Sequence, residues 1–524
     1  MLILSAFFLS KTIYLLFNDK KLARYSYILL LGFFQLNCYV TFVYGTLYGL
    51  AASVAGIFLL IKYFKKRNIV NGLVGISLLS IGYGFKSNYL IMIVAAFLLL
   101  LFDAIVKKSL KSVITLVWGI VFYVIIVTSI SSTIYHLTGK KVDEGTPNTA
   151  WVAMGLQESY KAPGWWNGYN AKVFADNEYD ISKTKEAISQ NISERMEELK
   201  KDKDYTMSFF SKKTASQWSE GTFECFYITN LDRGRLSNPT WTDSVKNLMV
   251  DGHSANRAVT TICNYFIVFL WLGIILFLIF DFRKLDAYKL IFAITFIGGF
   301  LFHLVWEAKG QYTIIYAYLM IPYMLRGYQL LLRRVCNISL GEKEAKEKRG
   351  TIIPVVVIAL VVIVIGISNN KVVNETIKLN GDKERYESYM SHQVDDLDDG
   401  NYTIIPGNDS SVTLAGLIDN DKKYSDKFAV DCSLISLCNK NSNGISDQSL
   451  GILEGKIDPG TSVGLSATDR SIFQRWIVKK VKDNTYEIYD EYNLALTYDK
   501  KEKKLSIEQY TGDKNQQWVI YLAK

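Results

Sequence analysis

One short segment between two apolar runs combines charged and aromatic side chains: Trp306-Glu307-Ala308-Lys309, followed by Tyr312. Charged groups at a membrane boundary usually face a cavity and mark a functional path. A lysine binds phosphate as a point charge, so we expect Lys309 to hold a phosphate group. Glu307 would orient Lys309 or serve as an acid/base. The structural alternative is a lysine that reaches toward the membrane surface and pairs with the glutamate.

Lys86 is a second candidate for phosphate binding, because it starts another expected helix within Gly84-Phe85-Lys86-Ser87-Asn88-Tyr89. A purely structural role is its alternative. His303 is grouped with Trp306 and Tyr312 as a candidate substrate contact, although its place in an apolar run favours a hydrogen-bonded core histidine. The remaining histidines have no partners at metal-ligand spacing, and no metal site is predicted for them: His136, His253 and His392.

Residues 134–258 form a long polar segment between apolar runs, and segments of this length are usually functional or fold as domains. Residues 182–202 within it are predicted to form an amphipathic helix. Aromatic faces stack on sugars, and interfacial tryptophans also lie at lipid headgroups, so a sugar or lipid platform is predicted here. An aromatic belt without a ligand is the alternative. The candidate platform residues are Trp151, Trp165, Trp166 and Trp218.

Half of the 524 residues are apolar and 21% are charged, which excludes a disordered chain. The apolar residues form long runs, which excludes an ordinary soluble enzyme and predicts a polytopic α-helical membrane protein with about ten transmembrane helices. The expected spans are 1–17, 25–43, 46–62, 68–84, 88–106, 112–133, 261–281, 288–306, 311–331 and 351–369. The net charge of +9 comes largely from short connectors, which indicates membrane rather than nucleic-acid binding.

Basic residues lie on alternate connectors, which are therefore expected to face the cytoplasm. These connectors are Lys20–Arg24, Lys65–Arg67, Lys107–Lys108, Arg283–Lys284 and Arg333–Arg349. Residues 134–258 and the chain after 370 are then extracytoplasmic, on the side of the connectors near Tyr44, Lys86 and Glu307. The same parity puts Met1 outside without a signal peptide. Two explanations remain open: residues are missing upstream of Met1, or the first helix inserts in reverse.

After a polar stalk at 370–399, residues 400–524 are predicted to form short β-strands. Gln474-Arg475-Trp476 recurs 42 residues later as Gln516-Gln517-Trp518, and a degraded third copy lies at Cys432-Ser433-Leu434. A Gln-x-Trp repeat of this period resembles the ricin-B-type β-trefoil lectins. The resemblance implies that the tryptophans fill a shared core, that the glutamines tie turns and that the domain binds carbohydrate; a spacer domain is the alternative. An extracytoplasmic location would also permit a Cys432–Cys438 disulfide.

The membrane half resembles the bacterial C-type membrane glycosyltransferases, the superfamily of protein mannosyltransferases and aminoarabinose transferases. The resemblance rests on Gly298–Tyr312, Phe42–Gly45, Lys86–Tyr89, Trp151–Leu156 and Trp218–Thr222. It implies sugar transfer from a polyprenyl-phosphate carrier on the outer face, with Lys309 and Lys86 at the carrier phosphate. It also allows a divalent metal, for which no ligands are identified. The family's catalytic carboxylate lies in a first outer loop without a counterpart here, so we expect a truncated member or a non-catalytic relative.

The sequence thus divides into a transmembrane bundle at 1–133, an extracytoplasmic mixed loop domain at 134–258, transmembrane helices at 259–369, a stalk at 370–399 and a β-trefoil at 400–524. The expected function is a hexosyl- or pentosyltransferase of the bacterial cell membrane that uses a lipid-linked sugar. Its expected partners are the lipid bilayer, the polyprenyl-phosphate sugar and a wall or surface glycan. Two alternatives stay open: a membrane-anchored lectin without catalysis, and a surface-polysaccharide polymerase or ligase.

Overall fold

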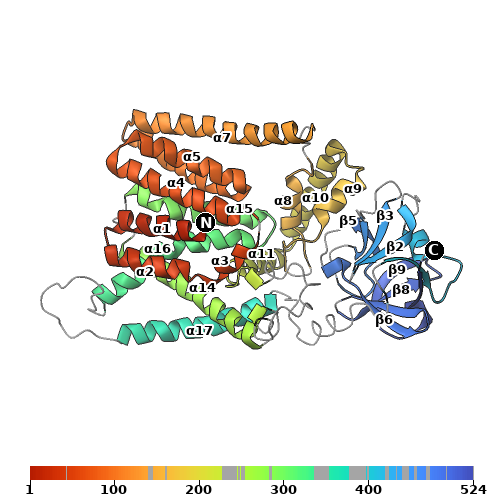
Figure 1. The fold of residues 1–524 in the computed structure, drawn as a ribbon. Coiled ribbons are helices and arrows are strands. Elements are labelled where there is room, and N and C mark those ends of the chain that lie inside the picture. Colours follow the sequence, from red (N-terminus) through yellow and green to blue (C-terminus); the bar gives the residue numbers. More distant parts are fainter. Residues whose placement is uncertain are drawn as a thin grey trace. The chain divides into compact units, whose positions relative to one another are not determined.

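The chain folds into two compact units in a computed structural model (Figure 1). The helical unit comprises Met1–Glu144, Phe210–Leu231 and Ala258–Thr376, and the second unit comprises Gly145–Phe209, Asp232–Arg257 and Ile377–Lys524. The structure describes residues 1–42, 44–139, 145–159, 162–226, 245, 248–249, 254–281, 286–335, 353–376, 397, 400–418, 424–431, 434–439, 448–453, 457–467, 472–490 and 492–522.

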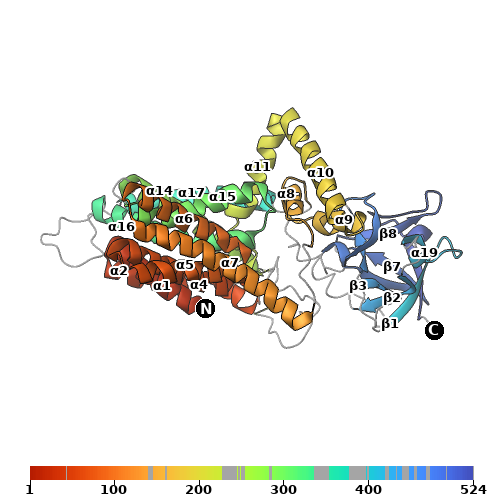
Figure 2. The same ribbon diagram turned by 90° about the horizontal axis from the view of Figure 1, so that it is seen from above.

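Long helices with roughly parallel axes form the helical unit (Figures 1 and 2). Their bounds are α1 Leu2–Phe17, α2 Lys20–Leu31, α3 Phe34–Cys38, α4 Thr46–Lys66, α5 Ile69–Phe85, α6 Leu90–Val106, α7 Leu110–Thr138, α14 Ser254–Phe280, α15 Ile291–Val305, α16 Gly310–Arg334 and α17 Ile353–Thr376. Helix α11, Lys203–Trp218, enters this unit with its C-terminal part.

Six helical segments among the described residues are long and apolar enough to cross a membrane. They are Thr46–Lys66, Ser87–Val106, Leu110–Thr138, Ser254–Phe280, Ala287–Val305 and Ile353–Thr376. Helices α1 and α5 are apolar but shorter, with 16 and 17 residues. These helices indicate a multi-pass membrane protein.

The expected map of ten spans differs from the structure at two further places. The run at 25–43 is not one helix, because α2 ends at Leu31 and the short α3 begins at Phe34. Helix α16, expected to span at 311–331, is less apolar than the six segments above. Most of its side chains are buried in the bundle, where neighbouring helices provide partners for polar groups. Arg326, for example, hydrogen-bonds to the carboxylate of Asp281 at 3.0 Å.

Two connectors with basic residues lie side by side at one end of the bundle. The Arg67 guanidinium donates two hydrogen bonds to the Asp103 carboxylate, which also accepts one from Ser112 Oγ at 2.6 Å. These contacts join the end of α4 to α6 and α7. Lys65 Nζ donates to the backbone oxygen of Leu15 at 2.8 Å and so links the end of α4 to α1. The basic connectors after α4 and after α6 are therefore at the same end of the bundle, as expected from their charge.

Three helices in the second unit share a small apolar core. They are α8 Thr149–Gly155, α9 Tyr169–Asp176 and α10 Ile181–Lys201. Buried Ala153, Val173 and Ile188 pack between them. The bounds of α10 agree with the helix predicted at 182–202. The expected loop domain at 134–258 is divided between the two compact units. Its residues 145–209 belong to the same unit as the C-terminal region, and its residues 210–231 belong to the helical unit.

The C-terminal region is an antiparallel β-structure with one short helix, α19 Leu414–Ile418. The strands are β1 Gly400–Pro406, β2 Tyr424–Asp431, β3 Leu434–Asn439, β4 Gln448–Ile452, β5 Val463–Ala467, β6 Ile477–Lys482, β7 Thr485–Tyr489, β8 Leu494–Asp499, β9 Lys504–Gln509 and β10 Gln517–Leu522. Their order is β5-β4-β3-β2-β1-β10-β7-β8-β9, with β6 paired to β7. Gly460 N donates to Ile507 O at 2.8 Å and Ile507 N donates to Thr461 O at 3.0 Å, so the two ends of the order meet and the sheet closes.

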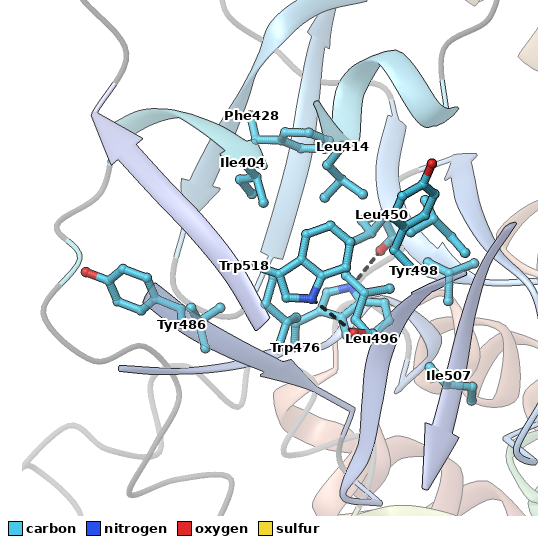
Figure 3. Packing of buried hydrophobic residues seen from close by; sticks show 14 of the residues in the cluster. Ile404, Leu414, Phe428, Leu450, Trp476, Tyr486, Leu496, Tyr498, Ile507 and Trp518 are labelled. Carbon is cyan, nitrogen blue, oxygen red and sulfur yellow. Dashed lines mark hydrogen bonds between the residues drawn. The ribbon is translucent and has the colours of Figure 1, made fainter. Parts of the chain in front are cut away.

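Two tryptophans occupy equivalent positions in the core of this β-region (Figure 3). Trp476 and Trp518 are fully buried, and their indole nitrogens donate to the backbone oxygens of Leu450 and Leu496 at 2.9 and 3.0 Å. Leu450 lies in β4 and Leu496 in β8, so each indole bonds to the same position of its own repeat.

The glutamine of each repeat is buried and holds a turn. Gln474 Nε2 donates to Ser466 Oγ at 2.7 Å, and Gln516 Oε1 accepts from the backbone nitrogen of Thr511 at 2.7 Å. With the closed sheet, these repeated contacts make the C-terminal region resemble a β-trefoil. Residues 432 and 433 of the third copy lie outside the described part of the chain, as do the side chains of Cys432 and Cys438, and His253 and His392.

Candidate functional site

Connectors that are far apart in the sequence meet around the ring of Tyr312 in the helical unit. Lys86 Nζ lies 5.3 Å from the centroid of this ring and 4.6 Å from the centroid of the Tyr44 ring. Lys309 Nζ lies 6.0 Å from the Tyr312 centroid. The two lysines predicted to bind phosphate are thus at one site, where they approach the same aromatic ring as cations.

A close approach of two helix ends positions Lys86. Gly45 precedes α4 with φ +30°, and a Cβ atom at this position would lie 2.1 Å from the backbone oxygen of Phe85. Only glycine allows this contact at this backbone conformation. Tyr89 Oη donates to the backbone oxygen of Thr46 at 2.6 Å, and Lys86 Nζ donates to Thr46 Oγ1 at 3.0 Å. The start of α4 therefore holds the Lys86 ammonium in place.

Glu307 is the buried carboxylate of the site and is only 1% exposed. Lys309 Nζ lies 3.3 Å from its Oε1 atom, and Tyr312 Oη donates to Oε2 at 3.3 Å. Burial raises the pKa of Glu307, while the positive charge of Lys309 opposes that change. The neighbouring Trp306 ring stacks on Phe302, with centroids 4.8 Å apart. Glu307 thus orients the ammonium group of Lys309.

A third lysine, which the sequence did not single out, belongs to the same cluster. Lys213 in α11 is 1% exposed and donates from Nζ to the backbone oxygen of Trp306 at 2.8 Å. Burial lowers its pKa to about 7, although the nearby Glu307 favours the charged form. The adjacent Lys212 is exposed. The sequence contains no signal that distinguishes these two lysines, because the burial of Lys213 depends on the distant connector between α15 and α16.

Lys86 is also held where its charge is costly. Burial lowers its pKa to about 7, and the positive charge of Lys309 lowers it further. One acidic residue beyond Glu307 approaches the site: Glu224 Oε2 accepts from the backbone nitrogen of Gln311 at 3.3 Å. Three lysines and two carboxylates thus gather here, and burial reduces charge of both signs, because it lowers the pKa of Lys86 and Lys213 and raises that of Glu307. An anionic ligand would favour the charged form of the lysines.

His303 is fully buried with its ring stacked against Tyr312, at 5.8 Å between centroids and an interplanar angle of 17°. The sequence favoured a hydrogen-bonded core histidine, and His303 lies in the core as expected. Neither ring nitrogen of His303 has a hydrogen-bond partner among the described residues. Buried polar atoms are usually paired, so this ring is a strong candidate for contact with a ligand.

The candidate aromatic residues are divided between the two compact units. In the helical unit, Trp218 is 6% exposed and packs against Phe296, Phe300 and Tyr316, with centroids 5.3, 5.6 and 5.8 Å apart. It is part of the packing beneath His303. In the second unit, Trp165 is buried, whereas Trp151 and Trp166 are half-buried.

The described residues contain no group of three or more His, Cys, Asp or Glu side chains that could hold a metal ion. The side chains that the described residues bring to this site are lysines, carboxylates and aromatic rings. Such a set binds a negatively charged group by charge and hydrogen bonding, and stacks an apolar or sugar ring.

No known protein family and no curated protein matches the chain. Among solved structures, the chain is similar to a designed 3-fold symmetric protein, ThreeFoil, with 17% sequence identity and a TM-score of 0.20. The similarity covers 23% of this chain and 98% of that protein. The fold of the β-region therefore rests on its own strand pairing and its repeated tryptophan contacts.

Proposed function

We propose that the helical unit binds the phosphate of a lipid-linked sugar at Lys86, Lys213 and Lys309 and transfers the sugar to a cell-envelope acceptor. The observation that supports this most is the convergence of three lysines from three separate segments on one aromatic site. Two of them, Lys86 and Lys213, are buried, and burying an ammonium group is costly. An anionic ligand would offset that cost.

The membrane topology supports a site on the outer face of a bacterial membrane. Lys86 and Lys309 lie on short connectors with few basic residues, whereas the short connectors rich in lysine and arginine alternate with them. Connectors rich in basic residues face the cytoplasm in most membrane proteins. A lipid-linked donor fits a site at a bundle end, because its chain stays in the bilayer while its phosphate enters the cluster.

The transfer reaction requires four changes. The acceptor hydroxyl loses its proton, its oxygen forms a bond to the anomeric carbon, the bond from that carbon to the phosphate oxygen breaks, and the phosphate leaves with the bonding electrons. The lysines would stabilise the charge that develops on the leaving phosphate. Glu307 is the carboxylate that would accept the acceptor's proton, because its raised pKa makes it a stronger base than an exposed glutamate.

Replacing single lysines tests this proposal. The probe is a polyprenyl phosphate added to the full chain in lipid nanodiscs, with binding measured by native mass spectrometry. Lys309→Ala and Lys213→Ala are expected to weaken binding at least about tenfold, the loss of one charged hydrogen bond. Lys212→Ala, which changes an exposed neighbour, should bind like the wild type.

Two results would contradict the proposal. One is unchanged polyprenyl-phosphate binding in both Lys309→Ala and Lys213→Ala. The other is a Lys213→Ala/Lys309→Ala double variant that binds polyprenyl phosphate and transfers radiolabelled sugar as well as the wild type, because binding and turnover would then be unrelated to this cluster.

A further inference from the structure

The second unit contains a cleft of about 520 Å³ between α9 and the strands β4 and β5. Small-molecule sites usually have volumes of about 300–1,000 Å³. The residues that line the cleft come from 157–187 and 448–473, and both segments belong to the same compact unit. The cleft is therefore a property of this unit alone, separate from the lysine cluster in the helical unit.

Aromatic side chains line one part of the cleft. The half-buried ring of Trp166 lies beside that of Phe473, with centroids 6.0 Å apart and an interplanar angle of 36°. Tyr169, the first residue of α9, lines the cleft with them. Flat apolar rings of this kind stack on the C–H faces of sugar rings, and a tryptophan offers the largest such face.

Amide side chains line another part, and hydrogen bonds hold them in place. Asn167 Nδ2 donates to Gln157 Oε1 at 2.9 Å, Asn167 Oδ1 accepts from the backbone nitrogen of Tyr169 at 3.1 Å, and Gln157 Nε2 donates to Asn191 Oδ1 at 2.8 Å. Gly168, with φ +79°, forms the turn that leads into α9. An amide both donates and accepts, which suits neighbouring hydroxyl groups. A pre-ordered loop also lowers the entropy cost of binding.

The charged residues of the lining indicate an uncharged ligand. Lys172 and Asp176 lie four residues apart on α9 and are both exposed. Their charges are opposite and therefore cancel at the rim. This differs from the lysine cluster, where positive charge predominates, and it gives no advantage to a phosphate or a uronic acid.

We propose that this cleft binds an uncharged oligosaccharide, stacked on Trp166 and hydrogen-bonded by the amides of Gln157 and Asn167. The inference does not depend on the transfer of sugar by the helical unit, because a membrane-anchored binding protein would use the same cleft. It also differs from binding through the glutamine and tryptophan of each repeat, since Gln474 and Trp476 are buried in the β-region.

The test uses the full chain in lipid nanodiscs on an array of neutral and anionic oligosaccharides. The neutral tetrasaccharide with the strongest signal is then titrated calorimetrically. Trp166→Ala is expected to weaken its binding at least about tenfold, through loss of the stacking surface. Ala175→Trp adds a bulky ring at an exposed position of the lining and should block binding without disturbing a core. Tyr521→Ala removes an aromatic ring of β10 that lies outside the cleft and should bind like the wild type.

Three outcomes would overturn the inference. The wild-type chain could bind no neutral oligosaccharide on the array, or it could bind only anionic ones. It could also bind neutral oligosaccharides equally well in the Trp166→Ala and Ala175→Trp variants, which would place the binding site elsewhere in the chain. Loss of binding in Ala175→Trp with normal thermal unfolding supports the cleft even if Trp166→Ala fails to fold.

Discussion

Replacing Lys213 by methionine separates the cost of its charge from its role in binding. Methionine has a similar length, is apolar and suits an irregular packed site. Lys213 is 1% exposed, and its Nζ atom donates to the backbone oxygen of Trp306. If Lys213 is retained to bind an anion, the variant should be more stable at low pH and weaker in binding.

The size of the stability effect follows from the pKa of Lys213, which burial lowers from 10.5 to about 7. Each pH unit between these values corresponds to about 1.4 kcal/mol, so the buried charge costs about 5 kcal/mol at pH 6. Between pH 7 and 10.5 the unfolded chain binds more protons than the folded one, so stability rises with pH and the cost falls to about 2 kcal/mol at pH 9. Against this gain, the Trp306 carbonyl loses its donor at a cost of about 1–3 kcal/mol.

The variant is therefore expected to be about 2–4 kcal/mol more stable than the wild type at pH 6 and nearly equal to it at pH 9. Thermal unfolding in detergent at the two pH values measures the difference, and the same samples are assayed for polyprenyl-phosphate binding. Lys212→Met is the matched control, because this neighbouring lysine is exposed and should change neither readout.

A lower unfolding temperature for Lys213→Met at pH 6, with no change in the difference at pH 9, would refute the reasoning. It would mean that Lys213 is not desolvated in the folded protein, or that its hydrogen bond outweighs the cost of its charge. Unchanged polyprenyl-phosphate binding by a stabilised variant would keep the electrostatic argument but remove Lys213 from the site.

Two further predictions concern the lysine cluster and the β-region. Affinity for polyprenyl phosphate is expected to fall between pH 7 and 9, by up to about tenfold per pH unit for each lysine, because Lys86 and Lys213 lose their charge above pH 7. Equilibrium binding across this pH range measures the affinity, and an affinity that does not change with pH contradicts the prediction. Trp476→Phe and Trp518→Phe should each destabilise the second unit by about 1–3 kcal/mol, because each substitution leaves a buried backbone carbonyl without its hydrogen-bond donor. Calorimetry measures the two changes in stability. A large effect in only one variant would mean that the repeats are not equivalent.

Simple rules of membrane insertion allowed part of the site to be predicted. Each membrane span carries the chain to the other side of the bilayer. Basic connectors and connectors with few basic residues are therefore expected at opposite ends of the bundle. This rule puts Lys86 and Lys309 on the same side, whereas the charged and aromatic residues around them made them candidates. The structure brings both to Tyr312. Likewise, Trp476 and Trp518 could be found because a shared core requires the same large residue in each repeat.

The parts that could not be predicted depend on tertiary packing. The apolar run at 25–43 is uniform enough for a span, and only the fold breaks it into α2 and α3. Lys212 and Lys213 are adjacent, and burial distinguishes them only once α11 packs beside the segment that contains Trp306. The missing partners of His303 are likewise invisible in the sequence, because a buried histidine is ordinarily hydrogen-bonded.

The energetic character of the site is an argument for binding rather than for structural support. Lys86 and Lys213 each lose much of their affinity for a proton on folding, and both ring nitrogens of His303 lack hydrogen-bond partners among the described residues. A structural ion pair would instead hold its lysine in the charged form, as Asp103 does for the Arg67 guanidinium, whose pKa it raises. Groups that are unfavourable in the folded chain are retained where a ligand provides the missing charge or hydrogen bond. The site around Tyr312 contains three such groups, Lys86, Lys213 and His303, whereas the described residues at the basic end of the bundle include an ion pair that keeps its arginine charged.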